Sequence, residues 1–149
     1  MKSLKTVTIL LVLSLSVLIS CELGEKNEST LSAEDLKLIT EIIPFSEGET
    51  IQMFESNGGF QGLKASGNFI TNLRLAAYWI DGKNDLINSI EYKEIDSLKT
   101  IDRVTALTYA SYLQVYSSEQ SNFKVYIDAD STRTWAFFNL AIESWNSNK

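Results

Sequence analysis

The sequence predicts an α+β domain that is mainly β. From residue 50 to residue 127, short segments with alternating apolar and polar side chains follow one another, separated by breaks rich in Gly, Asp, Asn and Ser. One helical pattern precedes this region and another follows it. With 149 residues, 44% of them hydrophobic and 11% aromatic, the chain is long and apolar enough for one domain with a substantial core.

Composition excludes several classes of function. The chain has no histidine and one cysteine, so an intramolecular disulfide cannot form. Its net charge is −6, and without residues 1–20, which hold two lysines and no acid, 11 basic face 19 acidic side chains, a net charge of −8. Because an acidic surface repels phosphates, the composition argues against nucleic acid as a partner.

Residues 1–20 have the pattern of an export signal. Lys2 and Lys5 precede an apolar run from Val7 to Ile19, which is too short to span a membrane comfortably. The following Leu18-Ile19-Ser20-Cys21 is similar to the bacterial lipobox, and this similarity implies cleavage before Cys21 and lipidation of that residue. The alternative is an ordinary secretory signal with an unrelated cysteine. We expect an exported chain, anchored to a bacterial membrane by Cys21 and facing the periplasm or the cell surface.

The remainder divides into a tether and a folded domain. Residues 21–31 comprise the lipidated cysteine and a polar stretch without periodicity, which predicts a flexible tether, and residues 32–149 form the domain. The domain begins with a helix from Ser32 to Ile43. Ser32 and Asp35 resemble a capping box, Leu31 and Leu36 have staple spacing, and Pro44 ends the helix.

The first strands surround a pair of glycines. We expect a strand at Thr50–Glu55 with Ile51 and Met53 on one face, and a hairpin at Asn57-Gly58-Gly59. A phosphate-binding loop is the alternative, but no Gly-Lys-Ser/Thr follows. Further strands are predicted at Gln61–Ala65, at Asn68–Thr71, and from Leu73 to Trp79, where Leu73, Leu75, Ala77 and Trp79 alternate inward.

The second half of the domain alternates more clearly. A strand carries Ile90 and Tyr92 on one face, and a loop after Leu98 leads into a strand at Val104–Tyr109. Strands at Tyr112–Tyr116 and Phe123–Ile127 flank a polar turn. A final helix, capped by Asp130 or Ser131, presents an apolar stripe of Trp135, Phe138, Ala141, Ile142 and Trp145.

The stretch from Gly67 to Lys99 resembles bacterial pleckstrin-homology-like (PH-like) domains. The similarity rests on the Thr71-x-x-Arg74 step into a strand and on a later strand with the pattern Ile90-x-Tyr92-x-x-Ile95-x-Ser97-Leu98. It covers roughly residues 48–145. It implies a bent antiparallel β-barrel of about seven strands, closed at one end by the C-terminal amphipathic helix, with the helix from Ser32 to Ile43 as an addition.

No catalytic residue, metal site or cofactor is predicted. Without histidine, Ser-His and Cys-His catalysis and zinc sites built from His and Cys are excluded. Asp128-x-Asp130 could bind calcium, but a strand end and helix cap explain it more simply, because no EF-hand loop surrounds it. Glu91, Glu94 and Asp96 could act as an acid–base pair, with a solvated strand as the simpler alternative.

Two groups of residues are candidates for binding. Lys64 and Arg74 are the basic residues near the first loop, with Glu55 beside them, which argues against a phosphoinositide site, and Arg74 is expected to pair with a carboxylate. Tyr109, Tyr112 and Tyr116 are the candidate partner-binding residues, joined by Tyr92 and Tyr126. The alternative is that half of these tyrosines line the barrel.

These observations lead to three hypotheses. The first is a non-enzymatic, lipid-anchored PH-like interaction module of the bacterial cell envelope that binds a protein partner. The second is a small-ligand or lipid-binding barrel, which needs an apolar cavity of a few hundred cubic ångströms. The third and weakest is an envelope hydrolase that uses carboxylates alone, which requires converging carboxylates with raised pKa values.

Overall fold

The computed structural model describes residues 31–56, 59–105 and 110–149. Its elements follow the predicted order of a helix, a run of strands and a closing helix. They are, along the chain, α2 (Ala33–Ile42), β1 (Ile51–Glu55), the 3₁₀ helix η1 (Gly59–Lys64), β2 (Ser66–Thr71), β3 (Arg74–Trp79), β4 (Leu86–Glu91), the 3₁₀ helix η2 (Tyr92–Glu94), β5 (Ser97–Ile101), β6 (Ser111–Tyr116), β7 (Phe123–Ile127) and α3 (Ser131–Ser147).

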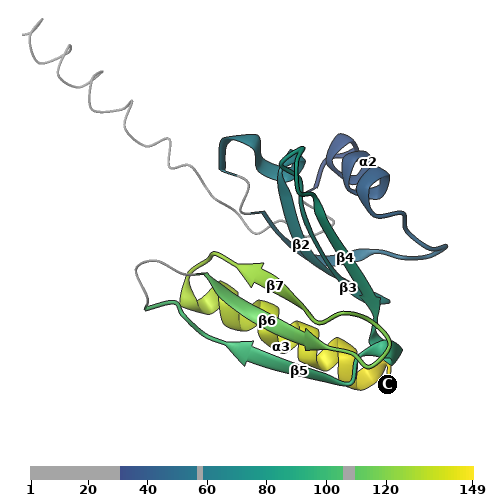
Figure 1. Cartoon of the computed structure of the whole chain (residues 1–149), viewed down its shortest axis with the longest axis vertical. Helices are drawn as coiled ribbons and strands as arrows, with labels where there is room; N and C mark the ends of the chain where they lie inside the picture. Colours follow the sequence, from purple (N-terminus) through teal and green to yellow (C-terminus); the bar gives the residue numbers. More distant parts are fainter. Residues whose placement is uncertain (1–30, 57–58, 106–109) are drawn as a thin grey trace, which may run out of the picture.

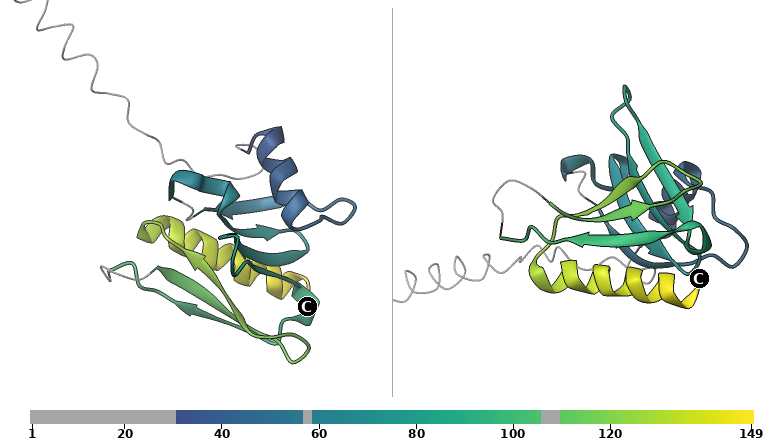
Figure 2. Two further views of the ribbon diagram at one scale, coloured as in Figure 1. Left: turned by 45° about the horizontal axis from the view of Figure 1, so that its top comes forward. Right: turned by 60° about the horizontal axis from the view of Figure 1, so that its bottom comes forward.

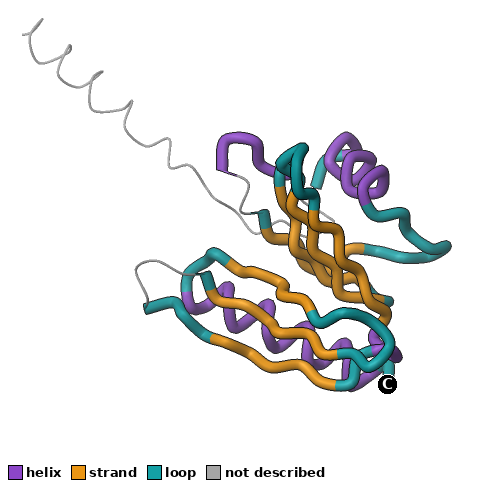
Figure 3. Tube along the Cα trace, viewed as in Figure 1, coloured by secondary structure: helices purple, strands orange, loops and turns teal. Residues whose placement is uncertain are grey.

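The strands form two antiparallel sheets (Figures 1 and 3). The first sheet has the order β1-β2-β3-β4 and the second has the order β5-β6-β7. The first sheet meets the second at its edge strand β7, and α3 runs along one face of the second sheet, so the two sheets and α3 share one core (Figure 2). The mainly β α+β class predicted from the sequence is confirmed, as are its two terminal helices.

The main core lies between the two sheets and α3. Ile70, Leu75 and Ile90 form one buried row across β2, β3 and β4. From the second sheet and from α3 come the buried side chains of Leu113, Val115, Phe123, Val125, Ile127, Phe137, Phe138 and Ala141. The clean alternation predicted for β7 therefore places Phe123, Val125 and Ile127 inward, as expected.

A second core lies on the other face of the first sheet, under α2. Ile39 and Ile43 pack there with Phe54, Phe69 and Tyr78. The predicted capping box is present, because the Ser32 hydroxyl accepts from the Asp35 N–H while the Asp35 carboxylate accepts from the Ser32 N–H. The helix ends at Ile42, just before Pro44, as the sequence predicts. The first sheet is thus covered on both faces.

The predicted closed barrel is wrong. The two sheets and the C-terminal helix are present as predicted, but within the described ranges no backbone ladder joins the first sheet to the second. The 3₁₀ turn η2 redirects the chain between β4 and β5, so the two strands belong to different sheets. A side chain makes the contact at the junction instead: the Asn68 amide oxygen accepts a hydrogen bond from the Tyr126 backbone N–H at 3.1 Å.

Two predicted elements differ near the sheet edges, and a third falls partly outside the described residues. Gln61–Ala65 is not a strand, because η1 covers most of it and supplies a ten-residue connection from β1 to β2 in place of a tight hairpin. Ile51 and Met53 do not share a face: a bulge between them turns Ile51 toward the α2 core and Met53 toward the main core. The glycine break at residues 57–58 lies outside the described residues.

The strand predicted at Val104–Tyr109 is misplaced. Val104 and Thr105 form a turn, residues 106–109 lie outside the described residues, and the strand β5 lies earlier, at Ser97–Ile101. Consequently the stretch from Ile90 to Leu98 is not one strand but the end of β4, the turn η2 and the start of β5. Alternation alone could not reveal this switch of sheets, because Ile90, Tyr92 and Ile95 are buried throughout it.

The inward set predicted for β3 is half right. Leu75 and Ala77 are buried in the main core, but Ala76 and Tyr78 are buried too, on the α2 side. Leu73 and Trp79 are exposed to 37% and 46%. A strand covered on both faces buries all its central residues, and its ends project beyond the cover.

The stripe predicted for α3 is rotated. Phe138 and Ala141 are buried, but Thr134 and Phe137 are the other buried positions, and Trp135 is 43% exposed. Asp130 caps the helix by accepting from the Arg133 N–H. The far end is fixed where the Trp145 indole donates to the Ile95 carbonyl at 3.1 Å. Among the described residues, no helix is long and apolar enough to cross a membrane.

Candidate functional site

The Thr71-x-x-Arg74 motif forms a buried structural network. The Thr71 hydroxyl accepts from the backbone N–H groups of Leu73 and Arg74, and it donates to the Glu49 carboxylate at 2.8 Å. The other Glu49 oxygen accepts from the Arg74 guanidinium at 2.6 Å and from the Ser46 N–H. The Glu49 side chain is fully buried. The motif therefore fixes the segment before β1 against the turn into β3.

Arg74 is a partner of a carboxylate, as predicted, and it also donates to the hydroxyls of Ser46 and Ser89. Lys64, the other basic residue near the first loop, is exposed at the end of η1. Glu55 is buried and paired with Arg133 at the start of α3. Lys64 and Arg74 do not form an anion site, because the Arg74 guanidinium is directed into the fold toward Glu49 and Lys64 lies separately on the surface.

The three carboxylates considered for acid–base chemistry have different partners. Glu91 pairs with Lys93 at 2.7 Å, Glu94 accepts from Gln120, and Asp96 accepts from Ser118. The hydrogen bond from Lys93 lowers the pKa of Glu91, the opposite of what a general acid needs. Asp130 serves as the α3 cap. In the described part of the chain, no group of three His, Cys, Asp or Glu side chains could hold a metal ion.

The structure separates the predicted tyrosines. Tyr112 and Tyr116 lie on the face of the second sheet turned away from α3, with Tyr126 beside Tyr112 at 5.6 Å between ring centroids. Tyr92 is buried, its hydroxyl donates to the Thr71 carbonyl, and burial raises its pKa. Tyr109, like the predicted lipidation residue Cys21, lies outside the described residues.

A cleft of about 280 Å³ lies in the corner between the two sheets. Its first wall is the end of the inner face of the first sheet, just beyond the buried row of Ile70, Leu75 and Ile90. Two cross-strand rows form this wall: Asn68, Ala77 and Asn88, then Ser66, Trp79 and Leu86. The small Ala77 and the short polar side chains leave space there that larger apolar residues fill in the core.

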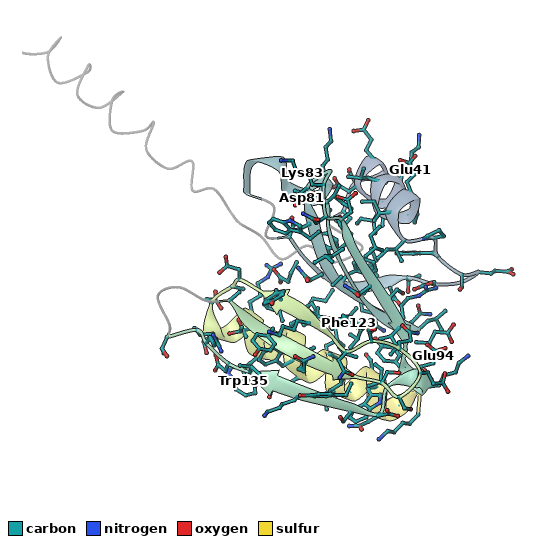
Figure 4. The ribbon with its side chains drawn as sticks, viewed as in Figure 1. Glu41, Asp81, Lys83, Glu94, Phe123 and Trp135 are labelled. Carbon is teal, nitrogen blue, oxygen red and sulfur yellow. The ribbon has the colours of Figure 1, made fainter. Side chains whose placement is uncertain are left out.

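The second wall comes from the second sheet. Lys124 and Tyr126 project from β7 on its outer face, and Ala110 lies just before β6. Figure 2 shows the first sheet rising from the second on the side opposite α3, which gives the corner its shape. Asp81 and Lys83 lie in the loop beyond β3, away from Glu94 at the other end of the sheet (Figure 4).

Exposed apolar side chains concentrate around this cleft. Around it, Trp79 is 46% exposed, Leu86 61% and Tyr126 42%, whereas Ile87, which is 52% exposed, lies on the other face of the first sheet in the cross-strand row of Tyr78. Leu86 and Ile87 belong to β4, which is the edge strand of the first sheet. Exposed apolar patches on a protein surface mark interaction sites, and an apolar edge strand without protecting charges is a place where another chain can dock.

Of the predicted tyrosines that the structure describes, Tyr126 lines the cleft, whereas Tyr112 and Tyr116 lie on the adjoining outer face of the second sheet, and the sequence analysis missed Trp79, Leu86 and Lys124. Trp79 was assigned inward because it continues the alternation of Leu75 and Ala77. A usable clue was present: Trp79 and Leu86 flank the polar turn around Asp81-Gly82, where a strand pair extends past its core. The position of Lys124 in the cleft depends on how the two sheets meet, which no local pattern specifies.

Comparisons with known proteins give a few similar structures. No family model and no curated protein matches the chain. A DUF1696 family protein with a pleckstrin-homology domain from Shewanella loihica PV-4 is similar at a TM-score of 0.48 and 15% identity, covering 84% of this chain and 95% of that one. A pleckstrin homology domain from Shewanella amazonensis SB2B is similar at a TM-score of 0.42 and 18% identity, covering 72% and 96%. Similarities of this size do not establish the family of the chain.

Proposed function

We propose that this chain is a non-enzymatic, lipid-anchored PH-like interaction module of the bacterial cell envelope, which binds a protein partner at the corner cleft. The PH-like assignment is supported by the seven antiparallel strands divided four and three and by the C-terminal helix packed against them. The anchor is supported by the lipobox-like residues before Cys21. Several acyl chains on one residue hold a protein far more firmly than one chain does.

One observation carries the assignment of the binding site. Trp79, Leu86 and Tyr126 are large, apolar or aromatic, exposed, and gathered around one concave place. Burying side chains of this kind supplies most of the free energy at protein interfaces, and aromatic residues in pockets are frequent hot spots. None of these side chains belongs to either of the two buried cores.

Cross-linking in the native membrane tests this proposal. The wild-type chain, Cys21→Ala, Trp79→Ala and Trp135→Ala are cross-linked in the source cells and the co-purifying proteins are identified. Trp135 is the matched control, because it is a tryptophan of similar exposure, 43% against 46%, on α3. We expect one protein in near-stoichiometric amount, lost with Cys21→Ala and Trp79→Ala but retained with Trp135→Ala. Equal recovery with Trp79→Ala and Trp135→Ala would exclude the cleft as the docking site.

The cleft volume supports a second candidate, a small-ligand or lipid-binding protein of the envelope. About 280 Å³ with Ala77, Trp79 and Leu86 on its walls is near the lower size of ligand pockets. Native mass spectrometry of the purified chain distinguishes the two. A retained small molecule, absent from Trp79→Ala, would favour this candidate over the interaction module.

A further inference from the structure

The outer face of the second sheet has an ordered set of side chains. The strand register places Ile101, Tyr112 and Tyr126 in one cross-strand row and Lys99, Gln114 and Lys124 in the next. Ser97 and Tyr116 continue the face in a third row. We call these eight positions the basic–aromatic face.

None of the eight strand positions is acidic, although the chain has 19 acidic and 13 basic side chains. Lys124 lies 4.6 Å from the centroid of the Tyr112 ring, and the Arg103 guanidinium lies 5.8 Å from the same ring. Within the described ranges, neither Lys99 nor Lys124 has a carboxylate partner. The nearby Asp102 is turned to the loop, where it accepts from Val104 N–H and the Ser111 hydroxyl. The face is thus a positive region on an acidic protein.

The basic–aromatic face and the corner cleft are continuous. Lys124 and Tyr126 belong to both, so Lys124 lies beside Trp79 and Leu86 of the first wall, and Lys99 lies farther along the face, on the other side of Gln114. The first sheet rises beside this face (Figure 2), which makes the combined surface concave. A flat bilayer cannot enter a corner of this shape, whereas a polypeptide segment can.

Resting on the proposed function, we propose that the partner presents an acidic segment of extended chain, with a large apolar side chain in the cleft and neighbouring carboxylates against Lys124 and Lys99. The apolar side chain would pack on Trp79, Leu86 and Tyr126. The carboxylates would pair with Lys124 and Lys99, which have no carboxylate partner among the described residues. Charge complementarity of this kind selects partners and speeds their association.

Calorimetry with model peptides tests the inference. The full-length Cys21→Ala chain is titrated with a blocked eight-residue peptide of alternating Glu and Leu, and with matched peptides in which Gln or Lys replaces Glu. We expect the Glu peptide to bind tightest, the Lys peptide weakest, and the difference to shrink as salt is added. In Lys99→Glu/Lys124→Glu, the affinity for the Glu peptide should fall by roughly tenfold, because two attractive pairs become repulsive. Lys37→Glu is the control, because this lysine is exposed on α2.

Equal binding of the Glu and Gln peptides, or no effect of the double reversal, would overturn the inference. Cosedimentation with phosphatidylcholine vesicles, with and without phosphatidylglycerol, forms a second arm. If the chain binds the anionic vesicles and Lys99→Glu/Lys124→Glu does not, the ligand of the basic–aromatic face is an anionic membrane surface and not an acidic segment, and the inference is wrong. In the native cross-linking, loss of the partner with Trp79→Ala but not with the double reversal would leave the proposed function standing and remove this inference. If the partner is retained with Trp79→Ala and also with the double reversal, both the proposed docking site and this inference are wrong.

Discussion

Gly67 and Tyr78 are neighbours across β2 and β3, and the glycine leaves room for the ring. A Cβ at Gly67 would lie 2.6 Å from Tyr78 Cζ and 2.7 Å from its hydroxyl oxygen. The ring cannot move aside easily, because the hydroxyl donates to the Leu63 carbonyl at 2.6 Å and the residue is 97% buried, with 3% exposed. A specific packing contact, not a turn, therefore requires glycine at this position.

We predict that Gly67→Ala lowers the free energy of unfolding by about 1–3 kcal/mol, the usual effect of overpacking. Urea denaturation followed by circular dichroism measures it. In a Tyr78→Leu background, where the ring is absent, the same Gly67→Ala change should cost less, since neighbouring substitutions are not additive. An equal cost in both backgrounds would show that the Tyr78 ring is not the reason for glycine.

Tyr78 also makes stability depend on pH. Burial, and secondarily the charge of Asp35, raises the pKa of its hydroxyl above the ordinary value of about 10. Above pH 10 the unfolded chain loses this proton while the folded chain keeps it, so the unfolded state binds fewer protons and stability falls as pH rises. The contribution is fully present below pH 10.

We therefore expect the free energy of unfolding to decline between pH 10 and 11, and to decline less steeply in Tyr78→Phe. Denaturation at a series of pH values measures the slope. Tyr116→Phe, on the exposed face, controls for removal of a hydroxyl. A slope that Tyr78→Phe leaves unchanged would assign the alkaline loss of stability to other groups, of which the buried Tyr92 is the first to consider.

At the scale of elements, the Glu49–Arg74 pair joins the segment before β1 to β3 and β4. The carboxylate is fully buried, and the guanidinium also contacts Ser46 and Ser89. Removing one partner of a buried pair leaves the other charge without compensation, which is much more costly than losing an exposed pair.

We predict that Glu49→Gln lowers the free energy of unfolding by about 3 kcal/mol or more. Glu41→Gln is the matched control, because Glu41 forms an exposed i,i+4 pair with Lys37, and its loss should change stability by no more than about 0.5 kcal/mol. Chemical denaturation measures both. Similar small effects for the two variants would mean that the network around Thr71 does not stabilise the fold.

The sequence predicted these elements unevenly. The capping box of α2, the strands β6 and β7 and the Asp130 cap follow local rules, and each formed where those rules place it. That Arg74 pairs with a carboxylate was also predicted, but Glu49, 25 residues away, is chosen by the fold. The strand β5 was misplaced because the segment after Leu98 gives conflicting signals: Ile101, Val104 and Leu107 have helical spacing, whereas Val104–Tyr109 has the composition of a strand.

For the whole molecule, local sequence patterns predict which segments form strands and helices, but not whether the strands close into a barrel. Alternation predicts individual strands, yet whether their edges join depends on the direction of the chain after η2, which the apolar pattern does not encode. The candidate site depends on the same geometry. Alternation could place Tyr112, Tyr116 and Tyr126 on the outer face of their strands, but the corner that brings Lys124 next to Trp79 exists only once the two sheets are placed.

The first sheet makes the two cores one cooperative unit. Leu75 and Ala77 of β3 face the main core, while Ala76 and Tyr78 of the same strand face the core under α2. Neither core can lose its packing without exposing one face of the shared strands. Small domains with a continuous backbone framework of this kind usually unfold in one step.

We therefore expect Ile39→Ala, under α2, and Val125→Ala, in the main core, to lower the same single thermal transition. Both side chains are fully buried, and truncations of this kind typically cost about 2–5 kcal/mol for isoleucine and somewhat less for the smaller valine. Far-ultraviolet circular dichroism reports the backbone, and near-ultraviolet dichroism reports the packed aromatic rings of both cores. The two signals should change together in each variant. An early near-ultraviolet transition in Ile39→Ala alone would show that α2 and its core unfold separately, and that the second sheet and α3 are stable without them.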